Sequence, residues 1–482
     1  MEDKRFDFVK NISGFSIATW VSFAIGFITA PITTRLFAPD QLGIIHMFVM
    51  VSGLIATTSL LGLDQAMIRF YYEPPHGTTK RYLTTTFTLV SLSFMLIAAV
   101  IAVLFLWQQI SEMITGSRSL SFVILLFVFS FARIIFTYLH LVYRMEGNIK
   151  WFTIQGVLYD VMISFLYVIV AFWFATYYPA ILVMSISGFC LAVTFLVIQR
   201  RSFEPRMHKP DPGFIQTIGK FALPLVPVNV IAWLNNYISA IILLNLLGPS
   251  DLGIYSIGIA LAGVIGILQA GFNVYWFPYV IKNYKENTTG IKEVHKVITA
   301  LLIMFGLLII LAQVPISMIL GTRYRDAMLF LPFLLVTPIC YTISETTKVG
   351  INIAKKTFWS PIILLSSVAV NILFCYLLIP VLQAPGAAMA SAIAALLSVA
   401  LGTIAGQKYY KSINNYSFML LSILFLLSSA AVSYVFTDEL LLKYGLLVAI
   451  LCIAMFFYRK VIHRLLHLAL DILRSFKKSV QH

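Results

Sequence analysis

Charged residues are scarce in this chain. They make up 11% of its 482 residues, whereas hydrophobic residues make up 60%. A soluble domain carries about 25% charged residues, so a soluble core could not bury this much apolar surface. Apolar stretches of roughly 20 residues, the length of helix that crosses about 30 Å of hydrocarbon, recur fourteen times between 12–34 and 440–458. The sequence therefore predicts an all-α polytopic membrane protein with fourteen transmembrane helices.

Cysteines are few, and the common catalytic motifs are missing. The four cysteines, Cys190, Cys340, Cys375 and Cys452, fall inside predicted spans at irregular spacing, which indicates neither a disulfide framework nor a metal site. The sequence has no Walker loop, no G-x-S-x-G elbow, no H-E-x-x-H and no soluble domain large enough for a nucleotide site. We therefore expect no enzyme activity, no cofactor and no transport energised by ATP within this chain.

The positive charge is distributed unevenly between the loops. If the N-terminus lies in the cytoplasm, 28 of the 34 Lys and Arg residues fall on that side, five fall on the opposite side, and Arg133 alone lies mid-span. This asymmetry follows the positive-inside rule and predicts that both termini are cytoplasmic. The net charge of +15 therefore reflects membrane topology, and no nucleic-acid partner is expected.

A duplicated segment indicates two copies of one unit. LFAPDQLGI at 36–44 returns as LLGPSDLGI at 246–254, and each copy lies in a short polar break between two apolar stretches. Six helices per copy is an even number, so the repeat is parallel, and such bundles usually hold their substrate between the halves. We predict an N lobe at 1–199 (helices 1–6), a cytoplasmic linker at 200–220, a C lobe at 221–407 (helices 7–12), helices 13 and 14 within 408–458, and a basic amphipathic tail at 459–482.

The tail allows two interpretations. Its apolar residues, from Val461 to Phe476, fall on one helical face, and basic residues occupy much of the rest. Such a helix can lie against anionic membrane lipids or cap the cytoplasmic end of the bundle, and periodicity does not separate the two.

Ionisable side chains inside predicted spans are functional candidates, because a charge at the bilayer centre costs roughly 3 kcal/mol. Arg133 lies about midway along helix 4. We favour anion binding by Arg133 over a structural salt bridge to Asp160 or Glu345, because a buried ion pair gives weak net stability. Glu345 and Lys348 lie three residues apart on helix 10 and are expected mainly to neutralise each other.

Other roles for these charges remain open. Ion coupling is the alternative for Glu345 and for Asp160 on helix 5. Lys348 is also a candidate for an anionic headgroup. Arg35, at the outer end of helix 1, fits a topology anchor best, with headgroup binding as its alternative.

Polar side chains on helices 7 and 8 form a second set of candidates. Asn235 and Asn236 lie on helix 7, and Gln269 and Asn273 lie on helix 8. Polar residues in a bundle most often bond a neighbouring helix. If they face a wet cavity, their paired donors and acceptors would suit sugar hydroxyls.

Several segments resemble those of a known family. ITTRLFAPDQLGI at the end of helix 1, DQAMIRFYYE after helix 2, GTRYRDA before helix 10 and the layout of six, six and two helices resemble the Wzx-type polysaccharide-transport flippases of the multidrug/oligosaccharidyl-lipid/polysaccharide exporter superfamily. The resemblance implies two six-helix lobes in a V around a central cavity, plus two extra helices.

The resemblance also implies a function. Such proteins move oligosaccharides linked to undecaprenyl diphosphate, such as polysaccharide or teichoic-acid repeat units, from the inner to the outer leaflet of the bacterial cytoplasmic membrane by alternating access. Expected partners are the lipid-linked substrate, membrane lipids, and the glycosyltransferases and polymerase of the same pathway. Coupling to H⁺ or Na⁺ is left open.

One departure and three alternatives qualify this reading. Related lipid II flippases carry arginines within helix 1, but here none lies between Asn11 and Thr34, so those phosphate-binding positions cannot be carried over. A multidrug or organic-cation antiporter should have acidic residues in its cavity, and helix 1 has none. A glycan polymerase or ligase usually needs a large outward loop, and none here exceeds about fifteen residues. A non-transporting scaffold leaves Arg133 and the duplication unexplained.

The charge asymmetry predicts a labelling pattern. Single cysteines placed in the loops at 200–213 and 282–295 of a cysteine-free variant should react with thiol reagents only after the membrane is permeabilised, because these loops are predicted to be cytoplasmic. Cysteines at outward positions such as Ser119 and Ser250 should label in intact cells. The reverse pattern would overturn the predicted orientation.

Overall fold

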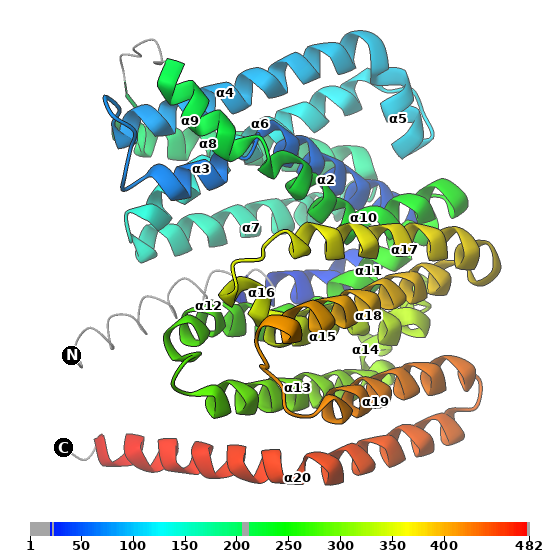
Figure 1. The fold of residues 1–482 in the computed structure, drawn as a ribbon. Helices are drawn as coiled ribbons and strands as arrows, with labels where there is room; N and C mark the ends of the chain where they lie inside the picture. The colour runs from blue at the N-terminus through cyan, green and yellow to red at the C-terminus, as the bar shows by residue number, and fades with distance from the viewer. Residues whose placement is uncertain (1–19, 22–23, 205–211, 480–482) are drawn as a thin grey trace.

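The computed structural model describes residues 20–21, 24–204 and 212–479. Regular secondary structure within this part is entirely helical (Figure 1). Thirteen of its helices are long and apolar enough to cross a membrane, and they overlap the second to fourteenth predicted spans. The predicted first span, 12–34, falls partly outside the described residues, which include a helix at 24–36.

The helices of the first half follow the one at 24–36, and a π-helix at Ala102–Leu106 joins α4 directly to α5. Their bounds are α2 Pro39–Ser59, α3 Leu63–Phe70, α4 Lys80–Ile101, α5 Trp107–Thr115, α6 Leu120–Met145, α7 Ile149–Ala171 and α8 Tyr177–Ile198. Helix α6 packs against α2, α4, α7 and α8, so it occupies the middle of this group.

The second half and the added helices follow. Their bounds are α9 Pro212–Ala222, α10 Leu225–Leu247, α11 Pro249–Ala262, α12 Ile265–Asn283, α13 Thr288–Leu311, α14 Gln313–Ile319, α15 Ala327–Thr347, α16 Val349–Ile353, α17 Trp359–Leu382, α18 Ala384–Tyr409, α19 Tyr416–Val435 and α20 Leu440–Ser479. Helix α15 packs against α11, α13 and α18, while α19 and α20 cover α13.

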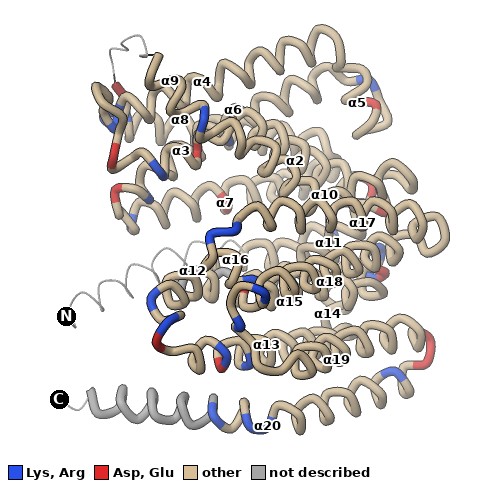
Figure 2. Tube along the Cα trace, in the orientation of Figure 1, with Lys and Arg blue, Asp and Glu red and all other residues tan. Residues whose placement is uncertain are grey.

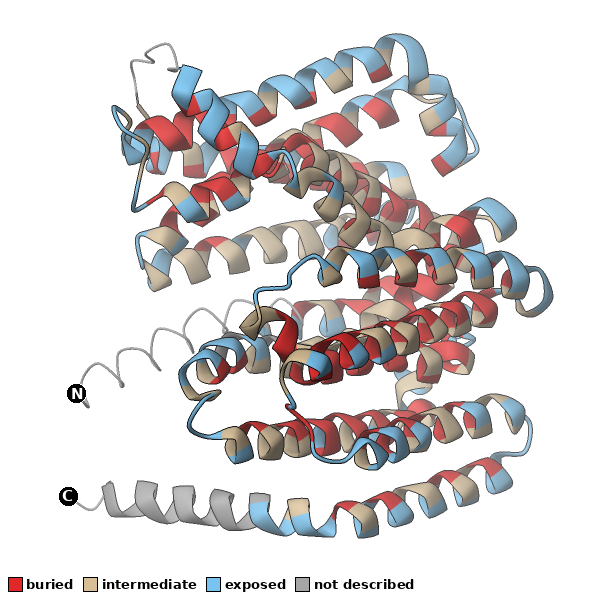
Figure 3. Cartoon of the chain, viewed as in Figure 1, coloured by how far each residue is buried: buried red, intermediate tan, exposed pale blue. Residues whose placement is uncertain are grey.

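The outer surface of the bundle is apolar, as expected of helices that face lipid. On α4, Leu96 is 60% exposed and Ile97 is 61% exposed, and Figure 3 shows exposed residues along the outer face of this helix. Lys and Arg gather mainly at one end of the bundle (Figure 2). The chain is a multi-pass membrane protein, and we call the opposite, charge-poor end the outward end, as the charge asymmetry predicts.

The two copies of the repeated segment touch each other at the outward end. A Cβ atom on Gly43 of α2 would overlap the carbonyl oxygen of Pro249, and one on Gly253 of α11 would overlap the carbonyl oxygen of Pro39. The contact is therefore reciprocal, with the helix that opens each copy packed on the backbone of the other. Only glycine permits this approach, because any side chain would hold the two backbones apart.

A second contact joins the lobes at the same end. The backbone N–H of Gly321 donates to Thr34 Oγ1 at 3.0 Å, and the Tyr324 hydroxyl donates to the carbonyl oxygen of Phe37 at 3.1 Å. Burial raises the pKa of Tyr324 above its ordinary value, and nearby Asp40 adds to that shift, so the hydroxyl keeps its proton. The GTRYRDA segment thus closes the outward end against the last residues of the first helix.

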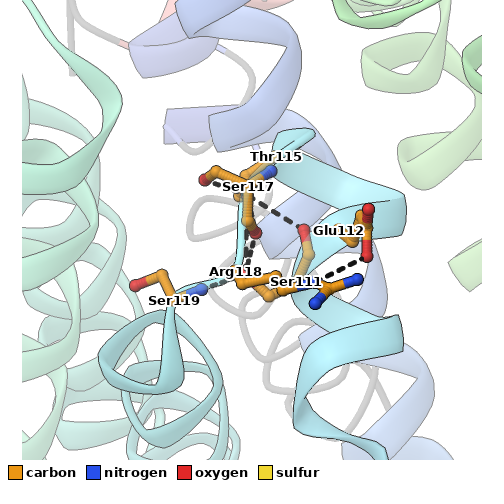
Figure 4. Close-up of polar contacts among 6 residues, drawn as sticks. All are labelled: Ser111, Glu112, Thr115, Ser117, Arg118 and Ser119. Atoms are coloured by element: carbon orange, nitrogen blue, oxygen red, sulfur yellow. Dashed lines mark hydrogen bonds and ion pairs between the residues drawn. The ribbon is translucent and has the colours of Figure 1, made fainter.

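The turn between α5 and α6 is fixed by its own side chains (Figure 4). Ser111 Oγ donates to the carbonyl oxygen of Ser117 at 2.6 Å and accepts the backbone N–H of Ser119 at 3.0 Å. Arg118 pairs with Glu112 at 3.2 Å, and Gly116 takes the left-handed backbone conformation at φ 69°. This turn is therefore held together by contacts among its own residues.

The predicted linker is partly helical. Helix α9 packs against α3, and its Phe214 ring lies 5.7 Å from the ring of Tyr82 on α4. Residues 205–211 of the predicted linker lie outside the described residues. The connection between the lobes is therefore anchored on the N lobe before α10 begins.

The predicted tail continues helix α20 as far as Ser479. Arg464 contacts α13 by an ion pair with Glu293 at 2.5 Å, and Lys296 pairs with the same carboxylate at 2.9 Å. The first residues of the tail therefore contact α13, and the choice between capping and lipid binding stays a prediction. The side chains after Arg464, which make most of the predicted apolar face, lie outside the described residues.

The glycine contact generates a prediction. Gly43→Ala should force α2 and α11 apart at a cost of about 1–3 kcal/mol, the usual cost of overpacking, which is roughly 5- to 150-fold in the open-to-closed equilibrium. A single cysteine at Phe37, which is 2% exposed, should then react at least about fivefold faster with a membrane-impermeant thiol reagent. Gly188→Ala on α8 is the matched control, because its added Cβ would meet no atom closer than 3.5 Å. Equal labelling rates with Gly43→Ala, with Gly188→Ala and with neither change would contradict the closed contact between α2 and α11.

Candidate functional site

Arg133 lies at the junction of three helices from both lobes. Its guanidinium projects from α6 towards Gly53 of α2 and Trp233 of α10. Its side chain is half-buried and forms no ion pair with a described residue. The salt bridges to Asp160 or Glu345 that the sequence left open are therefore not formed.

Five of the predicted site residues gather around one cavity in the C lobe. The cavity measures about 340 Å³ and is lined from α10, α12, α15, α17 and α18. The predicted residues in its lining are Asn235, Asn236, Gln269, Glu345 and Lys348. These residues bring amide, carboxylate and ammonium groups to the lining, and Tyr341, Ser344 and Ser398 add hydroxyl groups to it. Such a wall offers both donors and acceptors to a polar ligand.

The expected pairing of Glu345 and Lys348 is confirmed. Their side chains meet at 2.7 Å and are each about one-third exposed, at 34% and 32%. An opposite charge at this distance neutralises the cavity wall, so the pair leaves little net charge for binding a separate ion. Ion coupling through Glu345 therefore requires that this pair open.

A second, uncharged cavity adjoins the first and shares Asn235, Asn236 and Tyr341 with it. It measures about 250 Å³. Asn235 Nδ2 donates to the Tyr341 hydroxyl at 2.5 Å, while Asn235 Oδ1 is buried with no hydrogen-bond partner among the described residues. Asn235 therefore holds one buried, unpaired acceptor at the boundary of the two cavities.

Part of the wall of this second cavity was not predicted from the sequence. Ser239 Oγ donates to Asn371 Oδ1 at 3.0 Å and lies 2.8 Å from Ser391 Oγ, and both Asn371 and Ser391 line the cavity. The available signal was a single asparagine within the apolar helix at 359–383. Serine and threonine usually bond their own helix, as Ser391 also does to Ala387 at 3.0 Å, so they gave no sequence signal.

The remaining candidates lie elsewhere. Arg35 is exposed at the outward end, where it lines a cavity of about 550 Å³ with Arg323 and Arg325. Asp160 on α7 and Asn273 on α12 line neither C-lobe cavity. The described residues contain no cluster of three His, Cys, Asp or Glu side chains that could hold a metal ion.

The sequence matches the family model described as "Polysaccharide biosynthesis protein" over residues 8–284, which is more than half of the chain. The chain belongs to this family. The match spans the predicted N lobe, the linker and the first helices of the C lobe, so Arg133, Asn235, Asn236 and Gln269 lie within it. No curated protein matches the chain.

Solved structures show the fold of this family member. Lipid II flippase MurJ, in an inward closed conformation, is 14% identical, with a TM-score of 0.71, over 93% of this chain and 99% of that chain. An inward-facing multidrug resistance MATE transporter is 14% identical, with a TM-score of 0.57, over 80% of this chain and 94% of that one. An outward-facing MATE transporter is 15% identical, with a TM-score of 0.53, over 83% and 95%. The predicted fold class, an all-α polytopic membrane protein with a fold like that of MurJ and the MATE transporters, is confirmed. The predicted count of fourteen transmembrane helices is not, since thirteen candidate spans fall within the described residues.

Proposed function

We propose that this protein is a flippase that moves an oligosaccharide linked to undecaprenyl diphosphate from the inner to the outer leaflet by alternating access. The observation that carries the proposal is Arg133, a mid-membrane cation without an ion pair among the described residues. It lies where the two lobes meet, beside a C lobe with a neutralised polar cavity. An anionic headgroup supplies the missing counter-charge, and a glycan uses the polar walls.

The diphosphate is the part of the substrate that suits Arg133. An uncompensated guanidinium in a membrane interior is costly, and a phosphate repays that cost through short, charge-assisted and often bidentate hydrogen bonds. Arg35 and Lys348 were the other predicted cations for the headgroup. We assign Lys348 to its pair with Glu345, and we place Arg35 with Arg323 and Arg325 on the exit side of the path.

The glycan is the part that suits the C-lobe cavities. Asn235, Asn236 and Gln269 present amides, which both donate and accept, as sugar hydroxyls require. The two cavities measure about 340 Å³ and 250 Å³, and the first lies in the ordinary range for sites that hold small ligands. We propose that the sugars nearest the diphosphate occupy them. Asn273, exposed on the same helix as Gln269, would lie on the approach to this site.

The contacts at the outward end support a mechanism of alternating access. We infer that the contact between the two repeat copies blocks the way from Arg133 to the outer leaflet. Release therefore requires the Gly43 and Gly253 contacts to part. Rocking of two repeats about a site between them is the usual mechanism in duplicated transporters.

The cellular setting is part of the proposal. We place the protein in the bacterial cytoplasmic membrane with both termini in the cytoplasm, on the strength of the charge asymmetry seen in Figure 2. Glycosyltransferases would supply its substrate and a polymerase would consume it. Coupling to H⁺ or Na⁺ would fall to Glu345 or Asp160, the acidic side chains on α15 and α7.

An antiporter for organic cations is the second candidate, because MATE transporters share the fold. A cation needs an uncompensated carboxylate in the cavity. Glu345 in the C-lobe cavity is already paired with Lys348, and the charge without an ion pair at the lobe junction is positive. These charges favour an anionic substrate.

Arg133→Ala should therefore abolish complementation of a flippase-null strain and cause the lipid-linked glycan to accumulate. Losing the hydrogen bonds to a charged phosphate costs about 1.5–3 kcal/mol, or roughly 10- to 100-fold in affinity. Arg133→Lys should retain part of the activity, since it keeps the charge but loses the fork geometry. Arg118→Ala, at an exposed outward turn, is the matched control. Full activity of Arg133→Ala at normal expression would remove this residue from the site.

A further inference from the structure

The absence of a side chain at Gly53 leaves a small space between two hydrogen-bond donors. A Cβ atom placed on Gly53 would lie 3.4 Å from Trp233 Nε1, 3.5 Å from Arg133 Nη1 and 3.7 Å from Arg133 Cζ. The indole N–H comes from α10 and the guanidinium from α6. Two donors from different helices thus border the same point on α2.

The donor of Trp233 is buried and has no acceptor. Trp233 is 7% exposed, and its Nε1 has no hydrogen-bond partner among the described residues. The indoles of Trp276 and Trp359, by contrast, donate to the Glu345 carbonyl oxygen at 3.0 Å and the Tyr409 hydroxyl at 3.2 Å. A buried donor left unpaired costs about 1–3 kcal/mol, so such groups in native proteins call for an explanation.

We propose that Gly53, Arg133 and Trp233 form a notch that holds one oxygen of a phosphate or diphosphate group. The inference rests on the proposed function and extends it by adding Trp233 as a donor and Gly53 as the residue that makes room. The guanidinium supplies charge, the indole supplies a neutral, directional donor, and neither can accept a hydrogen bond. The notch therefore selects for an anionic oxygen and offers nothing to a cation.

The notch belongs to both lobes. Gly53 and Arg133 lie in the N lobe, whereas Trp233 lies in the C lobe, so all three residues meet only while the lobes are in contact here. Gly53 follows the sealing residue Gly43 by ten positions on the same helix, about 15 Å along its axis. An anion in the notch therefore favours the closed outward end, and parting the lobes at this seam removes one of its donors.

Binding to the purified protein in nanodiscs tests the notch. The probe is undecaprenyl diphosphate, with undecaprenol as the neutral control, and both are titrated by native mass spectrometry. Trp233→Phe removes the N–H and keeps most of the ring. Gly53→Ala places a methyl group where the oxygen would sit, at ordinary contact distances from its neighbours, so the fold should tolerate it.

Each variant should raise the Kd for undecaprenyl diphosphate about tenfold or more, which is the effect of losing a hydrogen bond to a charged group. Neither variant should change the binding of undecaprenol. Trp359→Phe and Gly188→Ala are matched controls and should bind both lipids like the unmodified protein.

Inorganic diphosphate, titrated alone, distinguishes a lipid headgroup from a free anion as the ligand of the notch. If it binds as tightly as the lipid and with the same sensitivity to Gly53→Ala, the notch stands but its ligand is a free anion.

The failures of the two proposals can be told apart. If Trp233→Phe and Gly53→Ala bind undecaprenyl diphosphate normally while Arg133→Ala does not, the notch is wrong and the proposed headgroup role of Arg133 stands. If Arg133→Ala also binds normally, both are wrong. Equal weakening of undecaprenol and undecaprenyl diphosphate would show that Trp233 and Gly53 act through packing, and would overturn the notch.

Discussion

The close approach of α2 and α11 is the constraint on which the rest of the structure depends. Gly43 and Gly253 let each repeat copy rest on the backbone of the other, so the two lobes meet at a contact to which both copies of one sequence element contribute. Other contacts lie near it. At the same end the first helix contacts the GTRYRDA segment, and the helix that carries Gly43 also carries Gly53, which lies close to Arg133 and Trp233.

The division of charge between the lobes follows from this arrangement. The N lobe contributes an isolated guanidinium at the junction, and the C lobe contributes polar cavities in which Lys348 already neutralises Glu345. An amphiphilic ligand with an anionic group next to a sugar chain fits this division better than a cation or a purely apolar molecule. The apolar outer surface of α4 and its neighbours leaves the lipid portion of such a ligand free to remain in the bilayer.

The sequence predicted the features that depend on local pattern. Span lengths, the duplicated segment and the i, i+3 pair of Glu345 and Lys348 all follow from spacing along one helix. The partners of Arg133 could not be predicted, because a mid-span position fixes depth in the membrane but not which neighbouring helices lie alongside. For the same reason, Trp233 and Gly53 gave no signal, and the sequence could not show that Asn235, Asn236 and Gln269 line cavities within the C lobe.

A disulfide across the repeat contact tests the central claim most directly. Asp40→Cys and Ser250→Cys, each one residue beyond the proline of its copy, should crosslink efficiently in a cysteine-free variant and hold the outward end closed. Lipid-linked glycan should then accumulate, and reductant should restore export. If the crosslink forms fully and export continues undiminished, the lobes do not rock about this contact, and a gate made by fewer helices must release the substrate.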